Sequence, residues 1–359
     1  MRVISWLVVS LTLWLAVSQA RANVLKRPFE LNRINRGLHG RVVDYTDRHD
    51  SDRRIFSAAL QEKRGLYVYL PPCYDPHKPY PLVIWLHGLT QDEHSFLEYA
   101  VSDLDQAMAS GQLPPAIVVA PDGSLSRIRC ARTGGSFFLN SKAGRFEDFV
   151  MQDVWDFVHH HYSIRPEPEA HVLAGVSMGG GAAFNLAIKH RDRVKVVFGF
   201  FPPLNLRWMD CHGNYMGNFD PNCWAWRQDT DRRMEVMGRF YGVITVRLWQ
   251  LLDPIFGRDN PQTLEELSRE NPAEMIDQLH LQPGELEMYV AYGAKDQFNM
   301  DAQVESFLYL ARQRGLTVGV GYDPQGRHDF HTAQRLFPGV IHWLAPRLAL
   351  YNPCCSAQH

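Results

Sequence analysis

The stretch HVLAGVSMGGGAAFNLAIKH, residues 171–190, decides the fold. Its first part is an apolar run of the kind that forms a buried strand, and its last part places apolar residues at helical spacing. Ser177 stands between the two parts and is surrounded by glycines. We therefore predict a strand, an abrupt turn at Ser177 and then a helix, which would leave the serine hydroxyl exposed at the tip of the turn.

The residues around this serine form the pattern Gly-x-Ser-x-Gly, known as a nucleophile elbow. Gly175 and Gly179 suit this pattern because the turn is too tight for side chains at those positions. Such a short pattern also arises by chance, so it is moderate evidence when taken alone. Serine is a poor nucleophile until a base activates it. The rest of the chain must therefore supply a base, an acid that orients the base, and an oxyanion hole.

Two late segments supply candidates for the acid and the base. Asp296 follows the strand-like run LEMYVAY, and His328 follows the turn in YDPQGRHDFH. The order serine, acid, histidine along the chain is the one found in enzymes that have this nucleophile elbow. An aspartate in a surface turn is the alternative for Asp296. His331 is the alternative base, but we prefer His328 because the loop, not the following helix, should carry the base.

The oxyanion hole requires two backbone N–H groups that point at the developing negative charge. Met178, directly after the serine, is one expected donor. Leu89, in the segment WLHGLTQDE that ends an early apolar strand, is the other. We interpret His87 in the same segment as a buried histidine that shapes the loop, not as a base.

The remaining pattern predicts an α/β fold with a mostly parallel central sheet flanked by helices. Apolar strand-like runs alternate with amphipathic helical stretches, which is typical of a parallel sheet covered on both faces. Strand-like runs within residues 41–70 should add antiparallel strands at one edge. The clearest apolar runs are 81–88, 116–123, 171–176 and 194–203.

Residues 204–271 interrupt this alternation. The segment holds a loop rich in Gly, Asn and Asp between Cys211 and Cys223, followed by the apolar and aromatic run MEVMGRFYGVITVRLWQLLDPIFG. We predict a helical insertion that caps the carboxyl ends of the strands; an extra packing layer with no role in binding is the alternative. Its aromatic residues favour an apolar or aromatic acyl group in the substrate, and they are Phe240, Tyr241, Trp249 and Phe256.

The first 22 residues have the features of a secretory signal peptide. An apolar run follows Arg2, and small residues stand where a signal peptidase would cleave, after Ala22. The run is about 15 residues long, shorter than the ~20 that span a bilayer, which argues against an uncleaved anchor. We therefore expect residues 1–22 to be a signal peptide and residues 23–359 to form the exported α/β domain, secreted or periplasmic.

Export changes the interpretation of the six cysteines, because disulfides form in oxidising compartments. Cys211 and Cys223 are the pair that we expect to be bridged. The chain has no CxxC pair and no HExxH helix, so a structural zinc site is disfavoured, and the expected chemistry needs no cofactor. A formal net charge of -2 gives no reason to expect a nucleic-acid partner.

Taken together, the motifs resemble those of the putative-esterase family of α/β-hydrolases, which includes esterase D, feruloyl esterases and mycolyltransferases. The resemblance runs from about residue 37 to 347, without the insertion. It implies a serine esterase in which Ser177, Asp296 and His328 form the triad and Leu89 and Met178 donate to the oxyanion. The segments that carry the resemblance are LYVYLPPCYDP, LVIWLHG, GGSFFLNS, RFEDFVMQDVWDFV, AGVSMGGGAA, YGAKDQF and GRHDF.

The chain departs from this family at three places. Cys73 stands where glycine is usual, Arg327 stands where a second glycine is common, and the insertion is longer than in simple esterases. The export signal also disfavours a cytosolic S-formylglutathione hydrolase.

The leading hypothesis is a secreted carboxylic-ester hydrolase that forms an acyl-enzyme on Ser177. An acyltransferase of the same fold is the alternative, and a non-catalytic binding protein is the third hypothesis. The expected partner is a small ester. A membrane contact through the insertion stays open, as does the oligomeric state.

Overall fold

The computed structural model describes residues 29–353, with gaps at residue 50, residues 126–133 and residue 241. The expected signal peptide, together with Cys130, Cys354 and Cys355, lies outside the described residues. Within the part of the chain that is described, no helix combines the length and apolar character needed to cross a membrane.

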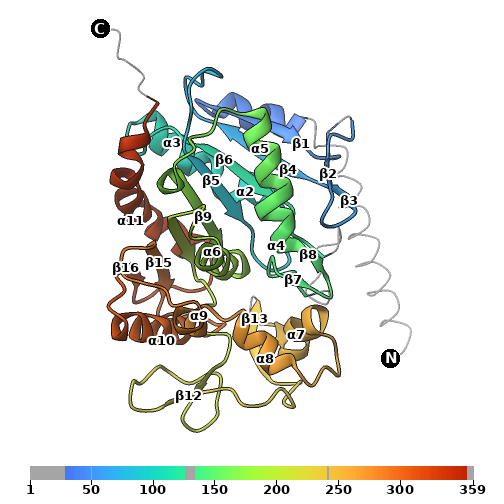
Figure 1. Ribbon diagram of the computed structural model, residues 1–359, viewed down its shortest axis with the longest axis vertical. Helices are drawn as coiled ribbons and strands as arrows, with labels where there is room; N and C mark the ends of the chain where they lie inside the picture. The colour runs from blue at the N-terminus through green and yellow to red at the C-terminus, as the bar shows by residue number, and fades with distance from the viewer. Residues whose placement is uncertain (1–28, 50, 126–133, 241, 354–359) are drawn as a thin grey trace, which may run out of the picture.

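An eight-stranded sheet forms the centre of the molecule, and helices flank it (Figure 1). Neighbouring strands from β6 to β16 pair in parallel, whereas β4 runs antiparallel to both β1 and β6. The predicted fold, with its antiparallel N-terminal edge, is therefore confirmed. In spatial order the strands are β1 (Arg41–Tyr45), β4 (Leu66–Leu70), β6 (Ile117–Pro121), β5 (Leu82–Leu86), β9 (His171–Val176), β10 (Val196–Phe200), β15 (Glu287–Gly293) and β16 (Val318–Asp323).

The connections between these strands carry most of the helices. Helix α6 packs on β9, β10 and β5, and α10 and α11 pack on β15. A π-helical segment, Phe149–Val154, joins α4 to α5. The helices are α2 (His94–Tyr99), α3 (Val101–Ala109), α4 (Phe146–Asp148), α5 (Trp155–His161), α6 (Met178–Lys189), α7 (Leu248–Phe256), α8 (Thr263–Arg269), α9 (Pro272–Gln278), α10 (Met300–Gln313) and α11 (Phe330–Leu348).

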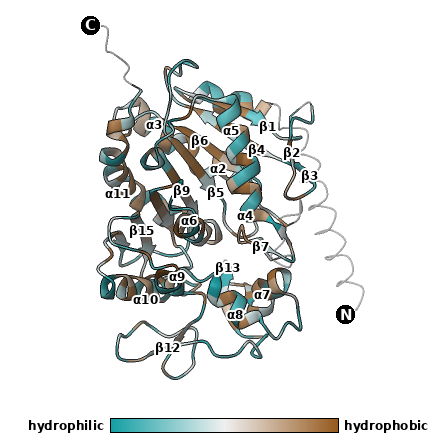
Figure 2. Ribbon diagram, viewed as in Figure 1, coloured by the Kyte–Doolittle hydropathy of each residue, from teal (hydrophilic) through white to brown (hydrophobic). Residues whose placement is uncertain are grey.

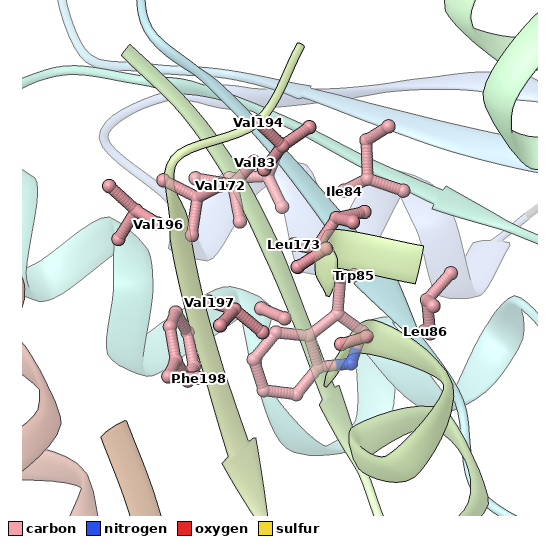
Figure 3. Close-up of a cluster of buried hydrophobic side chains, with 14 of the residues drawn as sticks. Val83, Ile84, Trp85, Leu86, Val172, Leu173, Val194, Val196, Val197 and Phe198 are labelled. Carbon is pink, nitrogen blue, oxygen red and sulfur yellow. The ribbon is translucent and has the colours of Figure 1, made fainter. Parts of the chain in front are cut away.

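The hydrophobic core lies on the central strands. Strands β4, β5 and β6 are buried at every residue, as is typical of strands covered on both faces. Figure 2 shows β5, β6 and β9 as hydrophobic. Figure 3 shows side chains of β5, β9 and β10 packed together, with the Trp85 ring against Phe198 at 6.2 Å between centroids. This packing fixes the strand ends from which the functional loops leave.

The insertion, residues 204–271, is not simply helical as predicted. Two small antiparallel pairs precede the helices: β11 (Trp208–Asp210) with β12 (Trp224–Trp226), and β13 (Val236–Phe240) with β14 (Ile244–Arg247). The second pair forms because β-branched residues favour strands and Gly242, at φ +73°, turns the chain between them. Figure 1 shows β12, β13, α7 and α8 gathered at one end of the molecule.

Two further short pairs of antiparallel strands lie outside the insertion. The insertion itself contains a disulfide. The pairs are β2 (Ile55–Ser57) with β3 (Glu62–Arg64), and β7 (Asn140–Ser141) with β8 (Gly144–Arg145). The predicted bridge between Cys211 and Cys223 is confirmed, with 4.7 Å between their Cα atoms.

Candidate active site

Ser177 occupies the sharp turn between β9 and α6. Its backbone has φ +53° and ψ -121°, a conformation that residues with a side chain rarely adopt. The Ser177 N–H donates to the Phe200 carbonyl of the neighbouring strand at 2.7 Å, which helps to hold the turn. A Cβ atom at Gly179 would lie 2.1 Å from the Leu86 carbonyl oxygen, so the turn can approach β5 only with glycine there.

Three side chains from distant parts of the chain meet at this turn. His328 Nε2 lies 2.9 Å from Ser177 Oγ, and His328 Nδ1 lies 2.8 Å from Asp296 Oδ2. A carboxylate accepts but does not donate, so Asp296 fixes the imidazole with its proton on Nδ1. Nε2 is then the free acceptor facing the serine hydroxyl, which is the arrangement needed for general-base activation.

The loops that carry the acid and the histidine are tied to each other. Asp296 follows β15, and its second oxygen accepts from the Phe298 N–H at 2.8 Å. Gln297 accepts from the His328 backbone N–H at 3.2 Å. A Cβ at Gly293 would lie 2.4 Å from Gly326 of the histidine loop, so the close approach of these loops depends on that glycine. The sequence pattern gave no signal for the role of Gln297.

Two aromatic rings pack against the imidazole, and a buried acidic side chain, Asp301, interacts with the charge of Asp296. The rings of Phe201 and Phe298 lie 5.0 and 4.9 Å from the His328 ring, between centroids. Burial and, to a lesser degree, the negative charge of Asp296 together raise the pKa of Asp301 to about 7. His331, the alternative base, lies in helix α11 and lines the neighbouring cleft.

His87 holds the loop that follows β5. Its Nε2 accepts from the Gly123 N–H at 3.0 Å, so the ring proton is on Nδ1, which donates to the Gly88 carbonyl at 2.9 Å. The Gly88 N–H donates in turn to Gln91 Oε1 at 2.9 Å. This arrangement matches the loop-shaping role expected for His87, and it positions Leu89 beside Ser177 at the same cavity.

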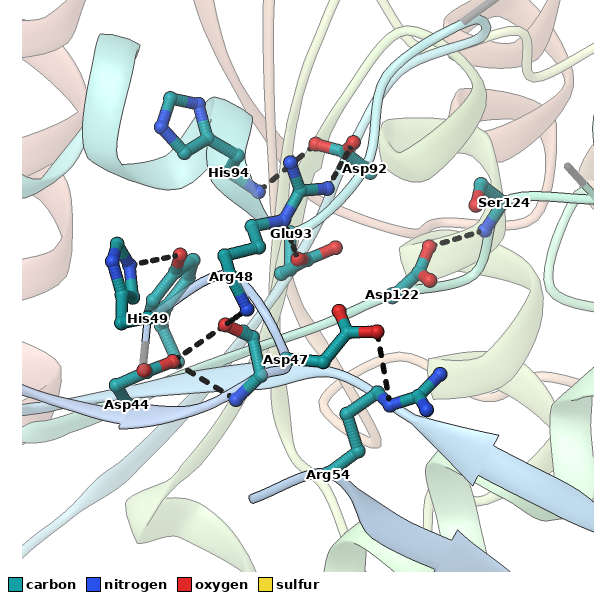
Figure 4. A network of polar contacts seen from close by, with 12 residues as sticks. Asp44, Asp47, Arg48, His49, Arg54, Asp92, Glu93, His94, Asp122 and Ser124 are labelled. Atoms are coloured by element: carbon teal, nitrogen blue, oxygen red, sulfur yellow. Dashed lines mark hydrogen bonds and ion pairs between the residues drawn. The ribbon is translucent and has the colours of Figure 1, made fainter. Parts of the chain in front are cut away.

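A buried polar network anchors the other end of this loop (Figure 4). The Arg48 guanidinium contacts Asp92 Oδ2 at 2.5 Å and Glu93 Oε1 at 2.7 Å. Burial and the negative charge of Asp122 raise the pKa of Glu93 to about 7, against the opposing effect of Arg48. Since Asp92 and Glu93 directly precede α2, Arg48 ties the segment after the Leu89 loop to the N-terminal edge of the sheet.

Two spaces open on Ser177. One is an apolar cavity of about 90 Å³ under the insertion, where Leu89, Met178 and residues of β13, β14, α7 and α8 line the walls. The other is a wider cleft of about 960 Å³ that contains His328, Arg239, Arg327 and other polar groups. Leu89 borders both spaces, Met178 only the cavity, and His328 only the cleft.

One group of described residues has donor atoms close enough to share a metal ion, namely Cys211, His212 and Cys223. The two cysteines are joined in a disulfide and have no thiolates to offer. This group therefore does not fit a metal site.

Comparison with known proteins identifies the family. The model of the Putative esterase family matches residues 57–343. An S-formylglutathione hydrolase from Arabidopsis thaliana is 26% identical over 199 residues, which cover 51% of this chain and 67% of the relative.

Solved structures share the fold at low sequence identity. A ferulic acid esterase superposes with a TM-score of 0.60 at 18% identity, covering 86% of this chain and 99% of its own. An S-formylglutathione hydrolase from Agrobacterium tumefaciens has a TM-score of 0.59 at 17% identity, covering 87% and 96%. The chain therefore belongs to the Putative esterase family, with an α/β-hydrolase fold, and is a carboxylic ester hydrolase.

Proposed function

We propose that this protein is a secreted serine esterase that works through an acyl-enzyme on Ser177. The observation that carries the proposal is the continuous chain of contacts from Ser177 Oγ through His328 to Asp296. His328 Nε2 takes the hydroxyl proton as Oγ attacks the ester carbonyl, and Asp296 stabilises the imidazolium that forms. The backbone N–H groups of Leu89 and Met178 are the proposed donors to the oxyanion.

Collapse of the tetrahedral intermediate completes the first half of the reaction. The bond between the carbonyl carbon and the leaving alcohol oxygen breaks, and His328 returns its proton to that oxygen. Water, deprotonated by His328, then attacks the acyl-enzyme and releases the acid with Ser177 regenerated.

The positions of the two spaces support a placement for the two halves of the ester. The group that protonates the leaving alcohol must face it, and His328 borders only the wide cleft. Met178, a proposed oxyanion donor, borders only the apolar cavity. We therefore place the alcohol in the cleft and the acyl chain in the cavity, which gives the insertion the role of an acyl-binding cap.

Two features support export. Residues 1–22 have the pattern of a signal peptide, and the Cys211–Cys223 disulfide is of a kind that persists in oxidising compartments. Edman sequencing of the protein recovered from outside the producing cell tests this point, with Asn23 as the expected first residue.

A p-nitrophenyl ester assay tests the enzymatic proposal. We expect wild-type protein to release p-nitrophenol with saturation kinetics, and Ser177→Ala to lower kcat by at least about 10³-fold. Added alcohols distinguish hydrolysis from acyl transfer, because new ester instead of free acid would favour the transferase. Equal rates for wild type and Ser177→Ala would exclude Ser177 as the nucleophile.

A further inference from the structure

We propose that the acyl cavity selects aliphatic acyl groups that carry a hydroxyl, and that Gln303 determines this specificity. The inference rests on the proposed function, because it assumes that the acyl chain occupies the apolar cavity beside Ser177. It concerns the substrate class, which the triad geometry alone does not specify.

Gln303 is a polar side chain in an otherwise apolar wall. It lies in helix α10, is 3% exposed and lines the same cavity as Ser177. Its amide nitrogen donates to the Tyr215 hydroxyl at 2.9 Å. Its Oε1 is buried and has no hydrogen-bond partner. A buried acceptor without a donor costs free energy. A ligand whose hydroxyl donates to this oxygen should therefore bind more tightly than the same ligand without the hydroxyl.

The hydrogen bonds of Tyr215 decide which way the Gln303 amide points. The Tyr215 hydroxyl has one proton, and it donates that proton to the Phe298 carbonyl at 2.7 Å. Toward Gln303 it can therefore only accept, so the amide nitrogen must face Tyr215. The Gln303 oxygen is consequently held away from Tyr215 and left as an acceptor. Rotation of the amide would place this oxygen against the Tyr215 hydroxyl oxygen and so oppose two acceptors.

The rest of the cavity indicates the chemical class of the chain. Apart from Ser177, Tyr215 and Gln303, the lining side chains are apolar, and most of them are Leu, Ile, Val or Met. The expected preference for an apolar or aromatic acyl group is thus narrowed to aliphatic chains, because most of the lining side chains are themselves aliphatic. A volume of about 90 Å³ is several times the ~10–15 Å³ that one water needs, so the cavity has room for several atoms of an acyl chain.

Matched pairs of esters test the inference. The substrates are p-nitrophenyl esters of four- to eight-carbon acids, each unsubstituted or bearing one hydroxyl at the terminal or penultimate carbon. For wild type we expect at least one hydroxylated ester to have a kcat/KM about tenfold above that of its unsubstituted partner. In Gln303→Met, which removes the acceptor but keeps the length, we expect that ratio to fall to one or below.

Leu251→Met is the matched control, because it changes the same cavity without changing its polarity, and it should retain the wild-type ratio. Thermal melting checks that each variant is folded, and Gln303→Leu replaces Gln303→Met if the latter does not fold. Unsubstituted esters favoured by wild type at every length, or a ratio unchanged in the folded Gln303 variant, would overturn the inference and leave the proposed function standing. Absence of turnover for every ester, with wild type no better than Ser177→Ala, would instead mean that the proposed function fails.

Discussion

At the scale of single residues, Ser177, the proposed nucleophile, has a strained backbone conformation. A non-glycine residue at φ +53° and ψ -121° costs roughly 1–3 kcal/mol, which the surrounding structure must offset. The hydrogen bond from Ser177 N–H to the Phe200 carbonyl and the first turn of α6 do so. The same geometry brings Oγ within 2.9 Å of His328 Nε2, so the strained conformation is the one that faces the base.

This strain predicts a difference between two inactive variants. Ser177→Gly and Ser177→Ala both remove the hydroxyl, but only glycine adopts a positive φ without steric cost. We expect Ser177→Gly to be more stable than Ser177→Ala by about 1 kcal/mol, or roughly two degrees in Tm for a chain of this size. Differential scanning calorimetry measures this, and a glycine variant that melts at or below the alanine variant would show that the turn is not strained.

The residue types of the site could be predicted from the sequence, but their supporting contacts could not. Ser177, Asp296 and His328 follow from a local pattern and from the order of chemical groups along the chain. Gln297 and Gln303 carry no such signal, because a glutamine next to the acid or inside a helix is ordinary in any sequence. Their roles depend on which loop or cavity wall lies opposite, and only the folded arrangement defines that.

At the scale of elements, the β11–β12 hairpin supports the turn that carries the acid. Tyr215, between the two bridged cysteines, donates its hydroxyl proton to the Phe298 carbonyl at 2.7 Å. Asn299 Nδ2 donates to the Tyr215 carbonyl at 2.6 Å. The disulfide therefore restrains a loop that packs directly against residues 298 and 299, which lie two and three positions after Asp296.

This contact predicts that the disulfide affects both stability and activity. Closing a loop of this size with a disulfide is worth about 3 kcal/mol in the chain-entropy model. We expect the double variant Cys211→Ser, Cys223→Ser to melt several degrees lower and to lose severalfold in kcat, because Asp296 is less firmly placed. Cys73→Ser, at an exposed free cysteine, is the control and should change neither. If the double variant has a lowered Tm but an unchanged kcat, the β11–β12 hairpin does not position the turn that carries Asp296.

The insertion is the element that sequence reasoning described least well. The run from residue 234 to 257 is mostly apolar with few charges, and periodicity alone does not separate a buried helix from a short hairpin. Its first part becomes β13 and β14 because a glycine turn interrupts it, whereas its second part becomes α7. The sheet strands were easier to predict. Their apolar runs alternate with amphipathic helices, and this alternation indicates a mostly parallel sheet covered by helices on both faces.

At the scale of the whole molecule, the buried acidic network makes stability depend on pH. Glu93 is 3% exposed, and its pKa is raised to about 7 by burial and by the charge of Asp122, against the opposing effect of Arg48. The folded state therefore holds a proton on Glu93 that the unfolded chain has already released above its usual value of about 4.5. The stabilisation from this proton is present below about pH 4.5 and is lost as pH rises through about 7.

Replacement of Glu93 by glutamine should remove this dependence. Glu93→Gln keeps an oxygen that can accept from Arg48 but carries no charge at any pH. We expect the variant to gain stability relative to wild type as pH rises from 5 to 8, by up to a few kcal/mol. Urea unfolding at each pH measures this, with exposed Glu265→Gln as control. A difference that stays constant across the range would show that Glu93 is charged throughout.

The most direct test of the account is covalent labelling by a fluorophosphonate, followed by intact-mass and peptide mass spectrometry. We expect wild type to gain one phosphonyl group, on the peptide that contains Ser177. We also expect His328→Ala and Asp296→Asn to react far more slowly, and Ser177→Ala not to react. A label on another residue, or equal labelling rates in wild type and His328→Ala, would contradict the claim that His328 activates Ser177.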